Sequence, residues 1–131
     1  MLAVGKIKAP YADDEAHYRR LLAKHARVEV VEVADDAALE RRIPDRTYVS
    51  LLDDGGASYS SEAFARWLEE RRQGGRDVCF VLGGAFGTAL GRFDHRLSLG
   101  PMTLPHQLAR VVLLEQLFRA HKILANEPYH H

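Results

Sequence analysis

The stretch from residue 78 to residue 87 reads Val-Cys-Phe-Val-Leu-Gly-Gly-Ala-Phe-Gly, and it decides the fold class. Its first five residues are all apolar, which is typical of a central parallel strand covered on both faces. The glycines that follow permit positive φ angles and close approach of another group to the backbone. Ligands of parallel sheets bind at the carboxyl ends of the strands. The stretch therefore predicts an α/β domain, with either a ligand-binding loop or a tight turn after residue 82.

Strand-like runs alternate with helix-like runs on both sides of this stretch. The expected strands are 2–7, 28–33, 47–52, 78–82 and 96–99, and the expected helices are 13–26, 35–42, a third that ends at Gly74-Gly75 and a fourth that begins near residue 103. Such alternation is typical of a mostly parallel sheet with helices on both faces. The sequence thus predicts one domain, residues 1–131.

Caps and turns set the expected boundaries of these elements. Asp53-Asp54-Gly55-Gly56 is expected to end the third strand as a turn. Ser60 or Ser61 is expected to cap the third helix. Thr103 is expected to cap the last helix, with Pro105 in its first turn, where a missing amide hydrogen has no consequence.

The composition excludes several classes of protein. With 18 basic and 18 acidic side chains, the chain lacks the excess positive charge of a nonspecific nucleic-acid binder, although a local basic patch can still contact RNA. No run approaches the roughly 18 apolar residues of a membrane-spanning helix, and the first residues do not resemble a signal peptide. The single cysteine, Cys79, cannot form an internal disulfide and is expected to be a buried apolar side chain. These features favour a cytoplasmic protein.

The motifs point to transfer chemistry with a bound cofactor. The glycine spacing matches neither the dinucleotide fingerprint nor a phosphate-binding loop, which argues against NAD and ATP. The sequence contains no Gly-x-Ser-x-Gly elbow and no Cys–His pair for covalent catalysis. No His-Glu-x-x-His motif or cysteine pair indicates a metal site. A bound-cofactor transfer reaction fits better than hydrolysis.

The last helix carries more apolar residues than one face requires. They run from Leu104 to Leu124, so one side can pack on the sheet while another meets a second copy of the chain. A fully buried central helix is the alternative. Arg110, Glu115 and Arg119 lie on or near its polar side, where most charges only solvate a surface.

Several blocks, in this order and spacing, resemble the RlmH family of ribosomal large-subunit RNA pseudouridine methyltransferases, small members of the SPOUT methyltransferases. The blocks are 81–87 (Val-Leu-Gly-Gly-Ala-Phe-Gly), Ser98-Leu99, 102–106 (Met-Thr-Leu-Pro-His), Arg110-Val111, 115–120 (Glu-Gln-Leu-Phe-Arg-Ala) and 126–130 (Asn-Glu-Pro-Tyr-His). The resemblance covers nearly the whole chain. It implies a carboxyl-terminal trefoil knot, S-adenosylmethionine as methyl donor and an obligate homodimer. The implied reaction methylates ring nitrogen 3 of a pseudouridine in large-subunit (23S) RNA on the assembled ribosome.

Two other interpretations remain beside this one. A SPOUT methyltransferase can act on another RNA, such as a transfer RNA, although the Asn-x-Pro-Tyr-His ending favours the ribosomal subfamily. A non-catalytic ribosome-associated module would keep the fold without turnover, which the intact Gly83-Gly84 and Tyr129-His130 argue against.

The resemblance also implies roles for individual residues. The cofactor would be held by Leu51, Leu52, Gly84, Gly100, Pro101, Met102, Thr103, Leu104 and Pro105, mostly through backbone groups, with Leu82 and Met102 as apolar walls. His130, Tyr129 and His106 are the catalytic candidates, because a proton must leave the acceptor nitrogen. Arg110 and Arg119 are the expected RNA contacts. Glu115 is expected to orient an arginine or residues 126–131, hereafter the tail.

Three departures from the family pattern are visible. The segment 34–46 is shortened, which is expected to trim a peripheral helix and spare the site. Glu127 stands where the family often has a histidine, and His131 where it often has an arginine. Both changes lower the positive charge of the tail, so we expect this chain to differ from the family in RNA binding and not in cofactor binding.

Overall fold

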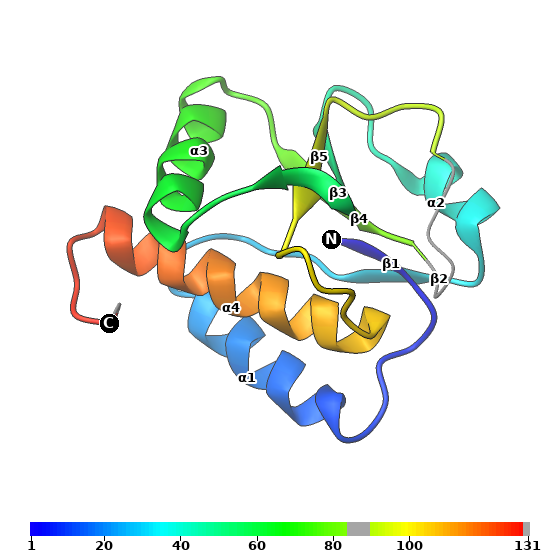
Figure 1. Ribbon diagram of the computed structural model, residues 1–131, viewed down its shortest axis with the longest axis horizontal. Coiled ribbons are helices and arrows are strands. Elements are labelled where there is room, and N and C mark those ends of the chain that lie inside the picture. The colour runs from blue at the N-terminus through cyan, green and yellow to red at the C-terminus, as the bar shows by residue number, and fades with distance from the viewer. Residues whose placement is uncertain (84–89, 130–131) are drawn as a thin grey trace.

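The structure is a computed structural model that describes residues 1–83 and 90–129. Strands and helices alternate as the sequence predicts (Figure 1). The elements are β1 (Leu2–Val4), α1 (Tyr11–Leu22), β2 (Val31–Val33), α2 (Asp36–Arg42), β3 (Tyr48–Ser58), α3 (Ser61–Gln73), β4 (Val78–Leu82), β5 (His95–Ser98) and α4 (His106–Leu124).

The five strands form one parallel sheet in the order β2-β1-β4-β3-β5. The apolar run 78–82 is β4, the middle strand, with β1 on one side and β3 on the other. A strand in this position has no exposed edge and both of its faces are covered, which is why its sequence is apolar throughout. The prediction of an α/β fold with a central strand at 78–82 is confirmed.

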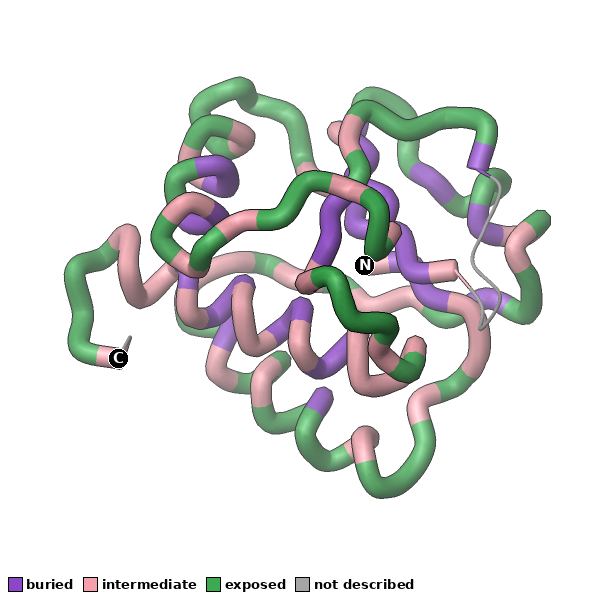
Figure 2. The backbone as a smooth tube through the Cα atoms, in the orientation of Figure 1, coloured by how far each residue is buried: buried purple, intermediate pink, exposed green. Residues whose placement is uncertain are grey.

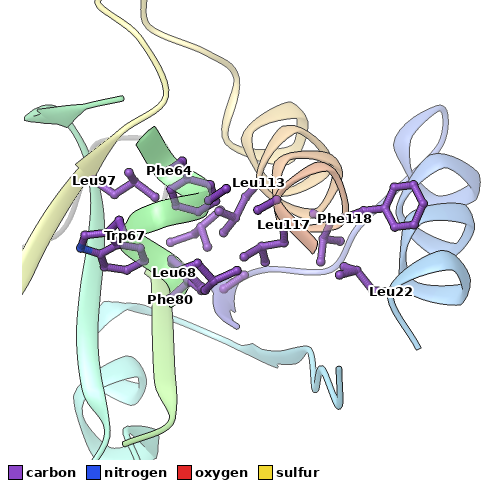
Figure 3. Packing of buried hydrophobic residues seen from close by; sticks show 14 residues of the cluster. Leu22, Phe64, Trp67, Leu68, Phe80, Leu97, Leu113, Leu117 and Phe118 are labelled. Atoms are coloured by element: carbon purple, nitrogen blue, oxygen red, sulfur yellow. The ribbon is translucent and has the colours of Figure 1, made fainter. Parts of the chain in front are cut away.

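Helices cover both faces of the sheet. The helices α1, α3 and α4 pack on one face, where Phe80 of β4 lies in one buried cluster with Trp67, Leu113 and Leu117. Figure 3 shows Leu117 of α4 between Leu68 of α3 and Leu22 of α1. The opposite face is covered by α2. There the buried side chains are Leu2, Val33, Leu39, Ile43, Val49, Leu51, Cys79, Val81 and Leu90. Figure 2 shows the same layering, with buried residues in the interior and exposed residues mostly in the connections around it.

Several predicted boundaries are wrong. The first strand ends at Val4 and not at residue 7, the first helix spans Tyr11–Leu22 and not 13–26, and the second strand begins at Val31 and not at residue 28. The third strand and the last helix differ as well.

The sequence Asp53-Asp54-Gly55-Gly56 does not end the third strand, because β3 continues to Ser58 through a bulge. Leu97 of β5 pairs with Leu52 before the bulge and with Ala57 after it. The four residues between them turn locally, and the Gly55 amide donates to Asp53 Oδ1 at 2.9 Å. A turn motif next to an edge strand can thus be absorbed as a bulge without ending the strand.

The last helix also begins later than predicted. It starts at His106 with Pro105 at the capping position, and no side chain caps it. Thr103 donates its hydroxyl to Asp54 Oδ2 at 3.2 Å. The hydroxyl is therefore used to join the bulge of β3 to the segment before α4. The cap prediction for the third helix is confirmed, since Ser60 Oγ accepts from the Ala63 amide at 3.1 Å.

Candidate functional site

The first part of the candidate site is the edge of the sheet where β3 stops pairing with β4 and enters the bulge beside β5. Leu51 pairs with Val81 of β4, and Leu52 pairs with Leu97 of β5. The two leucines are consecutive, so their side chains point to opposite faces of the sheet: Leu51 packs under α2, and Leu52 packs toward α3 and α4. At the edge of the sheet, both residues present backbone groups to a ligand, because their side chains pack on the two faces. Gly84, the third predicted contact from this edge, lies outside the described residues.

The second part is the segment 99–105, which links β5 to α4. Gly100 adopts a φ of +138°, a conformation that side-chain-bearing residues rarely adopt. Ser98 Oγ holds this turn, because it accepts from the Gly100 amide at 3.1 Å and donates to the Gly100 carbonyl at 2.8 Å. Met102 is 79% exposed, an unusual state for a large apolar side chain. Pro101, Thr103 and Pro105 are exposed, while Leu104 is partly buried.

The backbone of this segment is rich in available donors. Within residues 1–83 and 90–129, the amides of Met102, Thr103 and Leu104 donate no hydrogen bond. Free amides beside an exposed apolar side chain can bind a planar, hydrogen-bonding ring such as a purine. The donor set therefore fits the adenine of S-adenosylmethionine, and glycine at 100 is explained by the turn that exposes it.

The bulge of β3 holds the segment 99–105 in place through a side-chain hydrogen bond. The sequence predicts only a turn at these residues and does not indicate this role. Asp54 accepts from Thr103, and Asp53 forms an ion pair with Arg96 of β5 at 3.2 Å. A Cβ on Gly56 would lie 2.7 Å from the backbone of Arg96, so only glycine permits this approach. The Asp-Asp-Gly-Gly sequence fits a turn or a bulge at this point. Only the pairing of β5 on both sides of it shows that it is a bulge.

At the start of α4, the structure corrects one predicted RNA contact. Arg110 is buried, with its guanidinium 2.8 Å from Glu15 Oε1 and 2.9 Å from Glu32 Oε2, and it also donates to the Gly5 carbonyl at 3.2 Å. Its side chain is only 2% exposed. The guanidinium contacts three protein groups inside the chain, Glu15, Glu32 and the Gly5 carbonyl, and it is not presented to RNA. Its position on the helix suggested a polar face, but α1 and the segment after β1 cover that position.

The network around Arg110 also fixes the residues that precede α1. Burial alone would raise the pKa of Glu32, but hydrogen bonds from the Ile7 amide and from Arg110 outweigh it, so this pKa lies below its usual value. Gln107 accepts from the Lys8 amide at 3.1 Å and donates to the Lys6 carbonyl at 3.0 Å. His106, one helical turn before Arg110, is partly buried at the first position of α4.

Glu115 organises the third part of the site, near the middle of α4. Its carboxylate accepts from Arg119 Nε at 3.2 Å, from Arg119 Nη2 at 3.1 Å and from the Tyr129 hydroxyl at 3.3 Å. The Arg119 guanidinium lies 4.9 Å above the centre of the Tyr129 ring, whose edge packs on Phe118. The prediction that Glu115 orients an arginine and the tail is confirmed. His130 and His131 lie outside the described residues.

These contacts set the protonation of the tail. The hydrogen bond to Glu115 raises the pKa of Arg119, so its guanidinium stays charged. Burial and the Glu115 carboxylate raise the pKa of Tyr129, so the phenol is neutral near pH 7. In this arrangement Tyr129 is a hydrogen-bond donor and not a base.

Tyr129 and His106 do not meet within one chain. Tyr129 contacts Glu115, which is nine residues from His106 and hence about 13 Å along the helix axis. Figure 1 shows the tail beyond the end of α4 that is remote from the segment 99–105. Among the described residues, 126–129 of one chain therefore do not cover the carboxyl edge of its own sheet.

One further polar cluster was not anticipated from the sequence. His95 of β5 lies 2.9 Å from Ser50 Oγ through Nδ1 and 2.9 Å from the Tyr59 hydroxyl through Nε2. Its ring stacks on Trp67 at 4.8 Å, and burial and the nearby Arg71 lower its pKa. Ser50 is fully buried, so this is a structural hydrogen-bond network and not a nucleophile with its base.

Within the described ranges, no group of three or more metal-ligating side chains occurs. None of the helices in those ranges is long and apolar enough to cross a membrane.

Comparison with known proteins gives full-length matches. A family model described as "Predicted SPOUT methyltransferase" matches residues 1–130. A protein named Ribosomal RNA large subunit methyltransferase H from Nitratidesulfovibrio vulgaris (strain DP4) is 39% identical over 150 aligned positions, covering 100% of this chain and 96% of the relative. Proteins with the same name from Gemmatimonas aurantiaca and Gluconacetobacter diazotrophicus are 39% and 42% identical. Each of these two alignments covers 99% of this chain, with 97% and 95% of the respective relative.

Proposed function

We propose that this chain, which belongs to the SPOUT methyltransferase family and within it to the RlmH proteins, methylates ring nitrogen 3 of a pseudouridine in large-subunit ribosomal RNA. The reaction uses S-adenosylmethionine, takes place on the assembled ribosome and belongs to the cytoplasm. One observation carries the proposal: a full-length family match coincides with a segment of free backbone amides at the carboxyl edge of the sheet. That edge is where parallel sheets bind ligands.

The cofactor is held chiefly by backbone groups. The amides of the segment 99–105 would hold the adenine, and Leu51, Leu52 and Gly84 would border the cofactor from the neighbouring strands. Leu82 and the exposed Met102 supply apolar walls. When bound, S-adenosylmethionine supplies an electrophilic methyl group. The bulge of β3 keeps the segment in place through the bond between Thr103 and Asp54.

The acceptor nitrogen carries a proton at neutral pH, so a protein group must take or stabilise that proton. His130 and His106 are the candidates for this role, because a neutral imidazole nitrogen can accept a proton. Tyr129, a neutral phenol held by Glu115, donates a hydrogen bond and positions the base. Such positioning contributes as much to the rate as the proton transfer does.

A homodimer completes the site in this proposal. His106 and Tyr129 lie at separate places along α4, so in this proposal a second copy brings its tail to the carboxyl edge. Leu104, Leu108 and Val112 recur every four residues and remain partly exposed in the single chain. This stripe offers an apolar contact that closes by symmetry. The family also implies a trefoil knot around the segment 99–105, and we include it in the proposal.

Arg119 is the RNA contact that the proposal retains. Its guanidinium is 21% exposed and is held in one orientation by Glu115 and the Tyr129 ring. An arginine fixed in this way can contact a phosphate or a base carbonyl with little loss of side-chain entropy.

The cofactor half of the proposal is tested by calorimetry with S-adenosylmethionine. Gly100→Ala should weaken binding, because the φ of +138° strains an alanine and shifts the segment. Gly75→Ala is the matched control: it also has a positive φ and open space around the new Cβ, but it lies in the connection between α3 and β4. If the wild-type protein gives no heat and no thermal shift at high cofactor concentration, the cofactor assignment is wrong.

The substrate half is tested in a strain that lacks the protein. Mass spectrometry of its ribosomal RNA should show the loss of one N3-methylated pseudouridine. A lost methyl group in transfer RNA would instead identify another RNA as substrate. An unchanged RNA map together with intact cofactor binding would identify a non-catalytic module.

A further inference from the structure

We propose that Gln116 of α4 is a positioning residue, whose side-chain amide ties the Glu115 carboxylate to α3 and so sets where Glu115 holds Arg119 and Tyr129. It rests on the proposed function, in which Arg119 contacts the RNA and Tyr129 positions the base. Gln116 acts through Glu115 and is not a catalytic residue.

Two hydrogen bonds connect the start of α3 to Glu115. The Ser61 hydroxyl donates to Gln116 Oε1 at 2.9 Å, and Gln116 Nε2 donates to Glu115 Oε1 at 2.8 Å. Figure 1 shows the first turn of α3 beside α4, where this connection is made. The Glu115 carboxylate therefore has a donor that is tied to a second helix, in addition to Arg119 on its own helix and Tyr129 in the tail.

The partners of Gln116 determine how its amide is oriented. A carboxylate accepts hydrogen bonds and cannot donate them, so Glu115 requires the NH₂ group of the amide. The amide oxygen then faces Ser61, whose hydroxyl can donate. The reversed amide would place two acceptor oxygens, one from Gln116 and one from Glu115, against each other. Glutamine thus satisfies both neighbours in one orientation.

Ser61 is available for this contact because its neighbour caps α3. Ser60 Oγ accepts from the Ala63 amide at 3.1 Å, so the helix does not need the Ser61 hydroxyl as a cap. Ser61 is the first residue of α3, and its backbone is held by the helix. The two adjacent serines therefore have different roles: the first caps α3, and the second connects α3 to α4.

Packing alone does not explain a polar side chain at position 116. Gln116 lines a cavity of about 190 Å³ whose other walls are partly apolar: Phe64, Leu97, Leu99 and Val112. An apolar side chain of the same length would fill this place without the cost of desolvating an amide. The two hydrogen bonds are what the amide adds, and one of them ends on Glu115.

Without the bond from Gln116, Glu115 would be oriented by the same groups that it has to orient. An ion pair one turn apart on a helix leaves both long side chains considerable freedom. The side chains of Glu115 and Arg119 are 17% and 21% exposed, so water can reach the pair. The bond from Gln116 restricts the carboxylate, and the Arg119 guanidinium, 4.9 Å above the centre of the Tyr129 ring, is restricted with it.

The first test is steady-state methyl transfer to large ribosomal subunits that lack the modification. Gln116→Met keeps the length and the helix propensity of the side chain but cannot donate to Glu115. Its KM for the subunits should rise about tenfold, the effect of losing one hydrogen bond to a charged group, while its affinity for S-adenosylmethionine stays unchanged. Ser61→Ala removes only the first of the two bonds and should raise this KM less. In a Glu115→Ala background, Gln116→Met should cause no further change.

The matched control is Ser60→Ala. It removes the neighbouring hydroxyl and the cap of α3 but leaves both hydrogen bonds of Gln116 in place. The melting temperature of this variant should fall, because a helix cap is lost, while its KM for the subunits should not change. Melting temperatures of Gln116→Met and Ser61→Ala show that both variants are folded.

The second test does not depend on methyl transfer. The Nε hydrogen of Arg119 is bonded to Glu115 in the isolated protein, so NMR can measure how fast it exchanges with water. Exchange should be severalfold faster in Gln116→Met, because the carboxylate is no longer restricted. It should remain at the wild-type rate in Ser60→Ala.

KM and exchange rate equal to the wild type in Gln116→Met would overturn the proposal, and so would an equal rise in KM in Ser60→Ala. Faster exchange with an unchanged KM in an active protein would also overturn it, because the reaction would then not depend on how Arg119 is held. Faster exchange in Gln116→Met, in a protein whose wild type transfers no methyl group, would support the positioning of Arg119 and refute the proposed function.

Discussion

Arg110 and Arg119 occupy the same helix, nine residues apart, and the sequence predicts the same role for both. The structure separates them. Arg110 is 2% exposed between two carboxylates from α1 and β2, while Arg119 is 21% exposed on one carboxylate of its own helix. Arg110 connects α1 and β2 to α4, whereas Arg119 is partly exposed beside Tyr129. For an arginine on an amphipathic helix, what packs over the position decides between a structural and a binding role.

The largest expected effect is on the stability of the buried arginine network. Arg110→Ala leaves the carboxylates of Glu15 and Glu32 without their cation, and Glu15 is only 4% exposed. Loss of one member of a buried ion pair destabilises by about 3 to 5 kcal/mol. Urea unfolding should show a lowered free energy, and the variant with Glu15→Gln in addition should recover part of it. A loss of less than about 1 kcal/mol in the unfolding free energy of Arg110→Ala would contradict a structural role for Arg110 that Arg119 lacks.

The second expected effect is functional. Arg119→Ala removes a partly exposed pair within one helix, which contributes at most about 1 kcal/mol to stability. Its main consequence should be a raised KM for ribosomal subunits with unchanged affinity for S-adenosylmethionine. Arg119→Lys keeps the charge but loses the two-point contact with Glu115, so it should restore activity only in part. An unchanged KM for ribosomal subunits in Arg119→Ala would show that Arg119 does not contact the RNA.

The smallest expected effect is a pH dependence at the end of α4. Burial and the neighbouring His25 lower the pKa of His121, with Arg72 acting in the same direction and Glu69 against it. The folded state therefore binds a proton less readily than the unfolded state. This contribution to stability is complete above the usual histidine pKa of about 6.5 and is lost as the pH falls toward the lower folded value.

Unfolding free energies measured between pH 5 and pH 8 test this sign. The wild type should lose stability below about pH 6.5, and His121→Gln should show a flatter profile in that window. The Arg110 network adds no slope there, because Glu32, with its lowered pKa, titrates at a more acidic pH. A steeper profile in His121→Gln would contradict the assignment.

Much of the fold could be predicted because local patterns and packing agree. The apolar run 78–82 could only be a strand covered on both faces, and it is the middle strand of the sheet. Ser60 caps α3 because the hydroxyl and the Ala63 amide are three residues apart in the chain. Predictions of this kind depend on short-range geometry, which the sequence contains.

The remaining features depend on partners far away in the sequence. Asp53 to Gly56 becomes a bulge because β5, more than 40 residues later, pairs on both sides of it. Thr103 bonds Asp54 in place of its own helix. Ser50, Tyr59 and His95 form a network that no local pattern indicates. Glu115 was predictable, since Arg119 is one helical turn away.

The most direct test of the central claim is a reconstituted reaction with purified protein, S-adenosylmethionine and large ribosomal subunits from a strain that lacks the protein. Digestion of the RNA and mass spectrometry should find one added methyl group per subunit, on ring nitrogen 3 of a pseudouridine. Transfer RNA from the same strain, incubated in parallel, should gain none. A methyl group on transfer RNA alone, or none on either RNA despite measured cofactor binding, would contradict the account.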